Sequence, residues 1–246
     1  MTERIYFTCL STLKWYCLKT YEIEEHKEDK CVFMSSCLPL EDGKVLVHGT
    51  LEFKPGTKNQ FICLFSGGGK MIVKKDPNLG MSGLQMVNIG TDVFYISGNR
   101  CEKFCLITND LIRLEDLNFT HIKGGCCRYN STVLVISGLN CPEIEMLSIH
   151  NYWVKICSLP TSLFEISCVQ VGDEEVLCIN KKRTYRVNVN TGSCFGTVNY
   201  TVDINIVPVI KGDYVYSLNL AKQLIRYSLN SDKWENMSRG GCCFIF

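Results

Sequence analysis

The residues best suited to chemistry in this sequence are its cysteines, which number 16 among 246 residues. Cys101 and Cys105 have a Cys-x3-Cys spacing that a metal site could use. A structural zinc site normally has two such ligand pairs, and no second pair lies nearby, so we expect two core cysteines on one face of a strand. Most other cysteines lie within apolar runs, such as 61–64 and 176–179. A reduced cysteine packs there as a small hydrophobic residue, so we expect no metal.

Two further patterns are candidates for phosphate binding or catalysis. Gly67-Gly68-Gly69-Lys70 contains part of a phosphate loop, but that loop leads into a helix, whereas the apolar residues 71–73 that follow here indicate a strand. We interpret the run as a turn. No histidine lies in a Cys-His, Ser-His or His-x3-His arrangement; the four are His26, His48, His121 and His150. The sequence therefore predicts no catalytic or cofactor-binding residue, no cofactor, and a protein that is not an enzyme.

The composition indicates an all-β globular domain. The chain has a single alanine, Ala221, whereas helix-rich proteins use this strong helix former often. Hydrophobic residues make up 46% and charged residues 21%, and the formal charge is +1, with one short basic cluster at 181–183. This balance predicts no nucleic-acid partner. The acidic segment 22–29 is expected to be a solvated loop.

Nothing in the sequence predicts a membrane or secreted protein. No apolar run reaches the roughly 20 residues that a membrane helix needs, and the first residues lack the apolar region of a signal peptide. The expected location is the cytoplasm, with the nucleus as the alternative, and no membrane partner is expected. An even cysteine count also allows a disulfide framework, but disulfides are rare in that compartment.

Internal repeats organise the sequence. The run Gly-Gly-Cys-Cys at 124–127 recurs at 240–243, which is 116 residues later and corresponds to three units of about 39 residues. Short apolar runs that end in a small or polar pair recur at a similar interval, at 45–49, 94–98, 134–138, 176–180 and 214–218. The first interval is longer, and we interpret segment 53–59 as an enlarged turn within it.

Each repeat unit has room for four short strands. In the unit that begins at Gly124, strands are expected at 125–128, 133–137, 143–149 and 152–157. Trp15, Trp153 and Trp234 each follow a strand and a short polar turn, so each is expected to open the outermost strand of its unit. Repeated four-stranded antiparallel sheets of this length are typical of a β-propeller.

The pattern resembles the kelch repeat, in which the second strand ends in Gly-Gly and a third-strand Tyr precedes a fourth-strand Trp. The best match is 213–216 followed by 227–234, and no Gly-His and Trp-Asp pair of WD40 type lies in register. The resemblance implies one six-bladed propeller over residues 1–246. Complete four-stranded blades are expected at 31–80, 83–120, 124–161, 166–201 and 204–239. Two strands in 4–20 and one in 241–246 would share the sixth blade and close the ring, which removes exposed edges.

The kelch resemblance also implies a protein–protein interaction module, a recognition or scaffold domain with protein partners. Some kelch proteins recognise substrates for ubiquitin ligases. A narrower expectation is therefore that the chain is the substrate-recognition part of a ubiquitin-ligase adaptor, although the repeats are accompanied by no BTB, BACK or F-box segment. Function in a propeller lies in its loops. The turns between second and third strands supply the candidate partner-binding residues Asn99, Arg100, Asn140, Glu143, Lys181, Lys182 and Arg183.

If these turns share one face, Arg100 and the cluster 181–183 favour an acidic partner. Ordinary solvated turns would explain the same polar residues, because turns are polar for backbone reasons. Two other functions stay open: a divergent structural subunit of a larger assembly, and a small-molecule-binding or catalytic propeller that uses its central channel.

Overall fold

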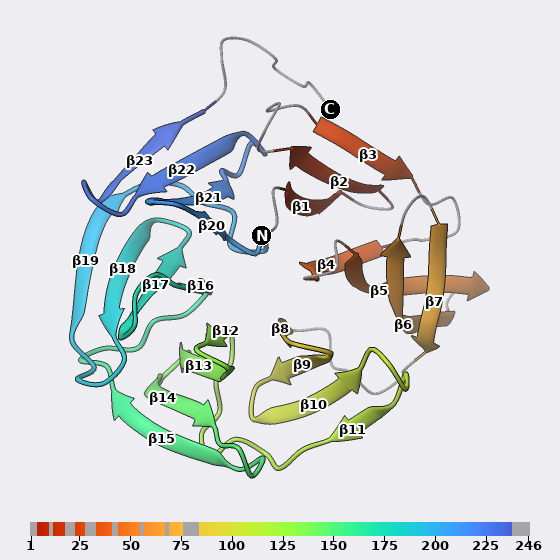
Figure 1. The fold of residues 1–246 in the computed structure, drawn as a ribbon, viewed down its shortest axis with the longest axis horizontal. Helices are drawn as coiled ribbons and strands as arrows, with labels where there is room; N and C mark the ends of the chain where they lie inside the picture. Colours follow the sequence, from red (N-terminus) through yellow and green to blue (C-terminus); the bar gives the residue numbers. More distant parts are fainter. Residues whose placement is uncertain are drawn as a thin grey trace.

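The protein is built from antiparallel β-sheets. The computed structural model describes residues 4–9, 12–17, 23–27, 33–40, 44–54, 57–66, 69–75 and 84–237, and within these ranges it contains no helix. The described strands form six sheets, which lie around a common centre with the first strand of each sheet innermost (Figure 1). The chain is therefore all-β, and the arrangement of its sheets is that of a propeller-like fold. Among these residues no helix has the length and apolar character of a membrane span.

Five of the sheets have four strands, paired with their neighbours in sequence order. Sheet by sheet, the strands are β4 (Phe33–Pro39), β5 (Val45–Lys54), β6 (Thr57–Ser66) and β7 (Gly69–Lys75); β8 (Gln85–Ile89), β9 (Asp92–Ser97), β10 (Arg100–Cys105) and β11 (Leu111–Arg113); β12 (Gly125–Tyr129), β13 (Thr132–Gly138), β14 (Cys141–Leu147) and β15 (Trp153–Ser158); β16 (Ile166–Gln170), β17 (Glu175–Asn180), β18 (Arg183–Asn188) and β19 (Cys194–Asn199); β20 (Val209–Lys211), β21 (Tyr214–Leu218), β22 (Leu224–Ser228) and β23 (Lys233–Asn236). The sixth sheet contains β1 (Arg4–Cys9), β2 (Thr12–Cys17) and β3 (Ile23–Lys27).

The recurring apolar runs form the second strand of each four-stranded sheet. In β13 and β17 the central residues are all buried, whereas the outer strand β15 exposes half of its six residues and buries one. A strand with neighbouring sheets on both faces buries both of its side-chain rows, so it reads as a continuous apolar run rather than as an alternation. The prediction of repeated four-stranded antiparallel units is confirmed.

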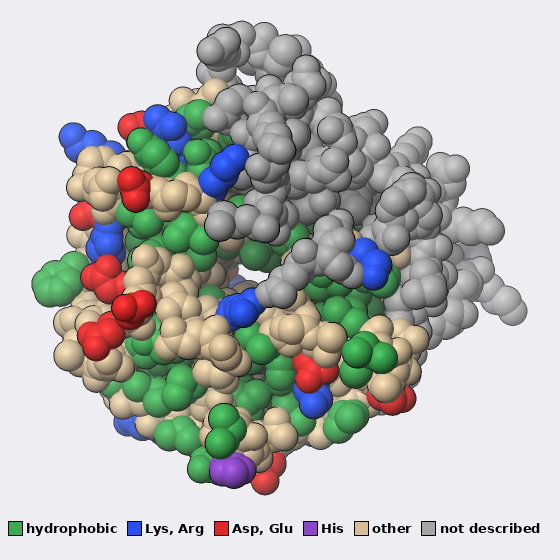
Figure 2. All heavy atoms as spheres, in the orientation of Figure 1, with side chains coloured by type: hydrophobic (Ala, Val, Ile, Leu, Met, Phe, Trp, Pro, Cys, Tyr) green, Lys and Arg blue, Asp and Glu red, His purple; other side chains and the backbone are tan. Residues whose placement is uncertain are grey.

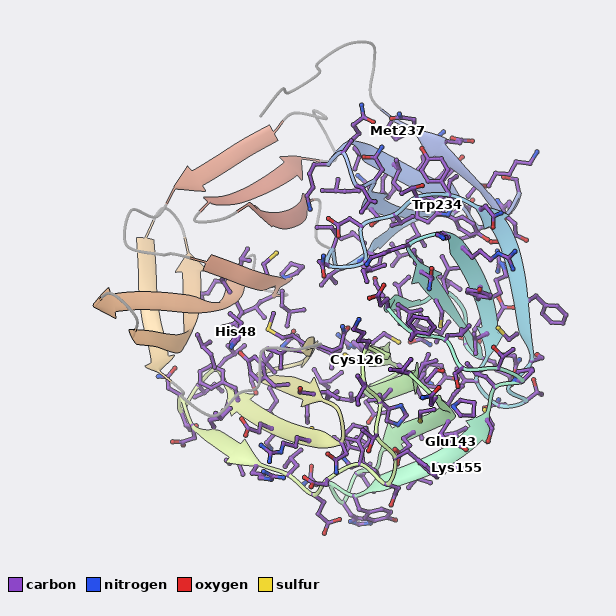
Figure 3. The ribbon with its side chains drawn as sticks, turned by 180° about the vertical axis from the view of Figure 1, so that it is seen from behind. His48, Cys126, Glu143, Lys155, Trp234 and Met237 are labelled. Atoms are coloured by element: carbon purple, nitrogen blue, oxygen red, sulfur yellow. The ribbon has the colours of Figure 1, made fainter. Side chains whose placement is uncertain are left out.

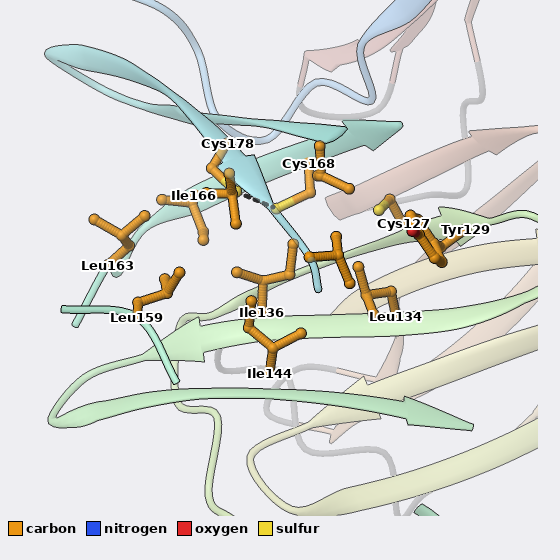
Figure 4. Packing of buried hydrophobic residues seen from close by; sticks show 13 residues of the cluster. Cys127, Tyr129, Leu134, Ile136, Ile144, Leu159, Leu163, Ile166, Cys168 and Cys178 are labelled. Atoms are coloured by element: carbon orange, nitrogen blue, oxygen red, sulfur yellow. Dashed lines mark hydrogen bonds between the residues drawn. The ribbon is translucent and has the colours of Figure 1, made fainter. Parts of the chain in front are cut away.

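Cysteines contribute to the core between adjacent sheets. Ten cysteines with described side chains are free, and seven of these are buried. Figure 4 shows Cys127 among the residues of one sheet that face Cys168 and Cys178 of the next. The sulfur atoms of Cys168 and Cys178 lie 3.6 Å apart. The hydrogen bond with Cys178, together with burial, raises the thiol pKa of Cys168, and burial raises that of Cys127. The prediction that these residues pack as small hydrophobic side chains is confirmed for the described part of the chain.

The inner strand β12 packs beside β16, and a glycine makes this possible. A Cβ atom added at Gly125 would lie 2.3 Å from the sulfur of Cys168 and 2.9 Å from Ile166 Cγ1. At Gly124 an added Cβ would lie 2.3 Å from the carbonyl oxygen of Ser137. The first Gly-Gly-Cys-Cys run is therefore a packing motif, in which the missing side chains allow two sheets and a loop to approach closely.

The acidic segment 22–29 corrects one expectation, because it contains the strand β3. This strand pairs with β2, so residues 4–27 supply three strands instead of two, and Trp15 lies on the middle strand between Tyr6 and Glu24. Trp153 and Trp234 do lie on outer strands, β15 and β23. An outer strand tolerates charged residues, and the backbone register pairs residues 23–27 with residues 12–16 of β2, so this charged segment forms a strand.

The long first interval also differs from its expected form. Segment 53–59 is not an enlarged turn, because β5 continues to Lys54 and β6 begins at Thr57, with these two residues paired. The extra length therefore lies in two strands of 10 residues each. The expected strand in 241–246 lies outside the described residues.

Gly125→Ala is expected to destabilise the fold by about 2 kcal/mol, because the added methyl group overpacks the contact with Cys168. Guanidinium unfolding monitored by tryptophan fluorescence measures the change. Cys168→Ala removes the clashing sulfur, so the double variant should lose less stability than the sum of the two single losses. Strict additivity of the two losses would contradict the close contact.

Candidate functional site

One face of the molecule carries both the turns between second and third strands and the loops that link successive sheets. Antiparallel pairing in sequence order brings these segments to the same ends of the strands. We call this the loop face; its described turns are at 98–99, 139–140, 181–182 and 219–223, and its described linking loops are at 114–124, 159–165 and 200–208. Hydrogen bonds join the two sets, as from the amide of Leu139 to the carbonyl of Ile122.

A cavity of about 290 Å³ lies between the inner strands and the linking loops. Its walls come from β4, β8, β12 and β16, and from the loops before β12, β16 and β20. Cys126, which lines the cavity, lies beside the central space in Figure 3. Figure 2 shows an opening at the centre of the face in view, with acidic and basic side chains interspersed over the described residues around it. The volume is at the lower end of the range for ligand pockets.

Two lysines and one carboxylate line this cavity on the loop face. Lys123 Nζ lies 2.8 Å from Glu165 Oε1, and Lys181 Nζ lies 2.9 Å from Glu165 Oε2. Hydrogen bonds from the two ammonium groups lower the pKa of the Glu165 carboxyl to about 2. We call these three residues the mouth cluster. Its net charge is one positive unit, because two ammonium groups share one carboxylate.

The backbone at the mouth cluster has an unusual conformation. The amide of Glu165 donates to the carbonyl of Lys123 at 2.7 Å, and the two residues have φ values of 50° and 55°. Such left-handed conformations cost a non-glycine residue of order 1 kcal/mol and persist only where the surroundings enforce them. The two linking loops are therefore fixed against each other, and they present Lys123 and Glu165 in one geometry.

A buried carboxylate anchors the loop that carries Lys123. Glu145 on β14 is fully buried and accepts four hydrogen bonds: from the amide and side chain of Asn118 at 3.0 and 2.6 Å, from the amide of Phe119 at 3.0 Å, and from His121 Nε2 at 2.9 Å. Burial raises the pKa of this carboxyl, but the hydrogen bonds outweigh burial and the pKa is lowered. The carboxylate therefore organises residues 118–121 as a single polar unit.

His121 completes this anchor on its other side. Its Nδ1 lies 2.7 Å from the carbonyl oxygen of Ser137, and its backbone pairs with Gly98 in the neighbouring sheet. A Cβ atom added at Gly138 would lie 2.9 Å from the backbone of His121. The glycine that ends the apolar run of β13 therefore gives the linking loop room to lie against the sheet.

The fold brings a cysteine close to His121, as in a nucleophilic dyad. Cys141 Sγ lies 3.8 Å from His121 Nδ1, but that nitrogen is already hydrogen-bonded to Ser137. Burial raises the pKa of the Cys141 thiol, which disfavours the thiolate that a nucleophile requires. The arrangement is better suited to anchoring the loop than to catalysis. Within the described part of the chain, no three His, Cys, Asp or Glu side chains are grouped as metal ligands.

The structure distributes the candidate residues from the sequence over the loop face. Lys181 belongs to the mouth cluster, and Lys182 and Arg183 are exposed beside it, with Arg183 Nε donating to Asn199 at 3.0 Å. Arg100 is exposed at the start of β10, and the carbonyl of Asn99 accepts the amide of Leu117 at 2.7 Å. Asn99 and Arg100 come from one turn and the cluster 181–183 from another, and of this group Lys181 alone lines the described cavity.

The other two candidates take different places. Asn140 is an exposed turn residue with a φ of 59°. Glu143 lies on β14, where its carboxylate is 2.8 Å from Lys155 Nζ and accepts from Ser158 at 2.6 Å; Figure 3 shows this pair near the outside of its sheet. Hydrogen bonds from Lys155 and Ser158 lower the pKa of Glu143. Glu143 is therefore committed to an ion pair within its own sheet.

Lys123 and Glu165 were missed by sequence reasoning. They are 42 residues apart, and each lies in the loop just before an inner strand, whereas the residues predicted from the sequence lie only in the turns between second and third strands. A usable signal was present, because Lys123 immediately precedes the Gly-Gly-Cys-Cys run. Comparisons with known proteins add no assignment, since no family model and no curated protein matches the chain.

Glu145→Gln is expected to lower the free energy of unfolding by about 3 kcal/mol at pH 7, because it removes a buried charge that four donors surround. For a domain of this size the melting temperature should fall by about 6–12 °C. Glu174→Gln, at an exposed carboxylate, is the matched control and should change little.

The difference in stability between wild type and Glu145→Gln should depend on pH. A carboxyl whose pKa is lowered by folding stabilises the protein above its unfolded pKa, and this contribution is lost as the pH falls through the folded pKa. The difference between wild type and Glu145→Gln should therefore narrow below about pH 4. A difference that stays constant from pH 7 to pH 3 would contradict the anchoring role of the carboxylate.

Proposed function

We propose that the chain is a six-bladed β-propeller of kelch type whose terminal segments share one blade. The six described sheets follow one another in sequence order around a centre, and among the described strands β1 pairs with β2 alone. That leaves the inner edge of β1 for residues 241–246. With β3 included, the shared blade then has four strands, one more than the sequence predicted.

We also propose that this propeller is a protein-recognition module that binds an acidic partner through its loop face. The observation that carries the proposal is the mouth cluster, in which backbone and side-chain contacts hold two lysines at the cavity on that face. Arg100, Lys182 and Arg183 add exposed positive charge from neighbouring turns. Complementary charge steers association and selects partners, and fixed loops reduce the entropy lost on binding.

The cavity by itself would also suit a small molecule, but its lining supports recognition better. Among the described lining residues there is one carboxylate, Glu165, and no histidine. Acid–base or metal chemistry normally uses several such groups converging on one point. A substrate-recognition part of a ubiquitin-ligase adaptor is one role in which such a face would act, and that narrower role rests on the kelch resemblance.

The charge-reversed variant Arg100→Glu/Lys182→Glu should reduce capture of partner proteins about tenfold, which corresponds to about 1.4 kcal/mol. Quantitative mass spectrometry after proximity labelling in cells measures capture by wild type and variant. Arg128→Glu/Lys233→Glu is the matched control, because both residues are exposed at the opposite ends of the strands. Equal capture by wild type and a folded Arg100→Glu/Lys182→Glu variant would overturn the proposed role of the loop face.

A further inference from the structure

Four large apolar side chains are exposed on the loop face; one of them, Leu220, lies in a separate turn, and backbone hydrogen bonds join the segments that carry the other three. Ile122, Leu139 and Phe164 expose 45%, 45% and 43% of their surface. Scattered exposed hydrophobic residues are normal, whereas a group of them bordered by polar residues marks an interaction site. We call these three residues the apolar patch.

Backbone contacts hold the patch together. The amide of Leu139 donates to the carbonyl of Ile122 at 2.8 Å. Phe164 directly precedes Glu165, whose amide bonds to Lys123, the residue that follows Ile122. The side chain of Asn180 donates to the carbonyl of Phe164 at 2.9 Å, which ties this loop to the turn that carries Lys181. Three segments from two adjacent sheets are thus fixed in one arrangement.

The mouth cluster borders the patch and presents positive charge. The side chains of Lys123 and Lys181 are 47% and 45% exposed, whereas that of Glu165 is 26% exposed and both of its oxygens are already paired. The accessible charge is therefore ammonium. An incoming carboxylate would meet the exposed side of these groups without displacing Glu165.

We propose that the apolar patch and the mouth cluster together bind a partner peptide in which a large hydrophobic residue lies close to an aspartate or glutamate. This inference rests on the proposed recognition function and names the chemistry of the partner. The hydrophobic side chain lies on Ile122, Leu139 and Phe164, and the acidic side chain pairs with Lys123 and Lys181. Lys123 directly follows Ile122 in the sequence, and Lys181 pairs with Glu165, the residue after Phe164. The two peptide residues therefore lie within about three positions of each other.

A peptide fits this surface better than other charged partners do. A nucleic-acid backbone would need a longer series of cations to neutralise successive phosphates, and the apolar patch would have no role in that contact. A short segment that joins one apolar and one acidic side chain uses both parts of the surface. Interfaces of this kind draw most of their affinity from a few buried anchor residues, and Phe164 is the largest candidate anchor in the patch.

Selection from a random peptide library displayed on phage, with the immobilised 246-residue chain as the target, tests this inference. The enriched sequences are synthesised with a fluorescent label and titrated by fluorescence anisotropy. We expect them to share a large hydrophobic residue within three positions of an aspartate or glutamate. Phe164→Ser and Lys181→Gln should each weaken binding about tenfold, and raised salt should weaken it further.

Two matched control variants show whether a loss of binding comes from the altered surface or from a loss of folding. Phe195→Ser changes a phenylalanine that is 68% exposed on β19, outside the patch, and Lys233→Gln changes an exposed lysine on β23. Both should bind the selected peptides like wild type. Circular dichroism and melting temperature show whether each variant is folded.

Other outcomes would overturn the inference. It fails if no peptide is enriched over empty support, if the enriched peptides lack acidic residues, or if their affinity is unchanged by Phe164→Ser. If partner capture in cells still depends on Arg100 and Lys182 in that case, the recognition function stands and only the assigned peptide chemistry falls. If that dependence is also absent, both fail.

Discussion

The rest of the structure depends on the close approach of adjacent inner strands around the centre. Where β12 meets β16, the absence of a side chain at Gly125 allows the sulfur of Cys168 to lie against the backbone, and apolar residues of both sheets fill the space behind it. This contact sets the spacing between neighbouring sheets, and therefore the distance between the linking loops above them. The bond between Glu165 and Lys123 spans two such loops, so the mouth cluster can form only when the sheets are packed this closely.

Two carboxylates with lowered pKa values have different roles in this arrangement. Glu145 is buried, and four hydrogen-bond donors on residues 118–121 compensate for its loss of water. Removing any one of these donors would leave buried charge uncompensated, so Glu145 holds residues 118–121 in place. Glu165 lies at the cavity, partly exposed between two lysines. It fixes the lysines while leaving their outer sides accessible, which gives this part of the loop face a positive surplus.

The sequence predicted the features that depend on neighbouring residues in one run, and it did not predict those that depend on residues brought together by the fold. The second strand of each sheet was predicted because its apolar run is continuous. The cysteines were predicted to be core residues because they lie in such runs. Strand β3 was missed because Glu24 and Glu25 are typical of loops, and its strand conformation depends on pairing with β2. At the site, Lys181 was found in a polar turn. Glu145 gave no signal, since its role depends on Asn118 and His121, which are distant in the sequence and adjacent only in the fold.

In the proposed six-bladed ring, residues 241–246 would pair with β1, close the ring and hold the loop face in one shape. Hydrogen–deuterium exchange of the segment Arg4–Cys9, compared between the full chain and a chain that lacks 241–246, tests this most directly. If residues 241–246 close the ring, alternate amides of β1 are protected in the full chain and exchange at least about tenfold faster after truncation, while those of β13 are unchanged. Equal exchange of β1 in both chains would contradict closure by the terminal segments.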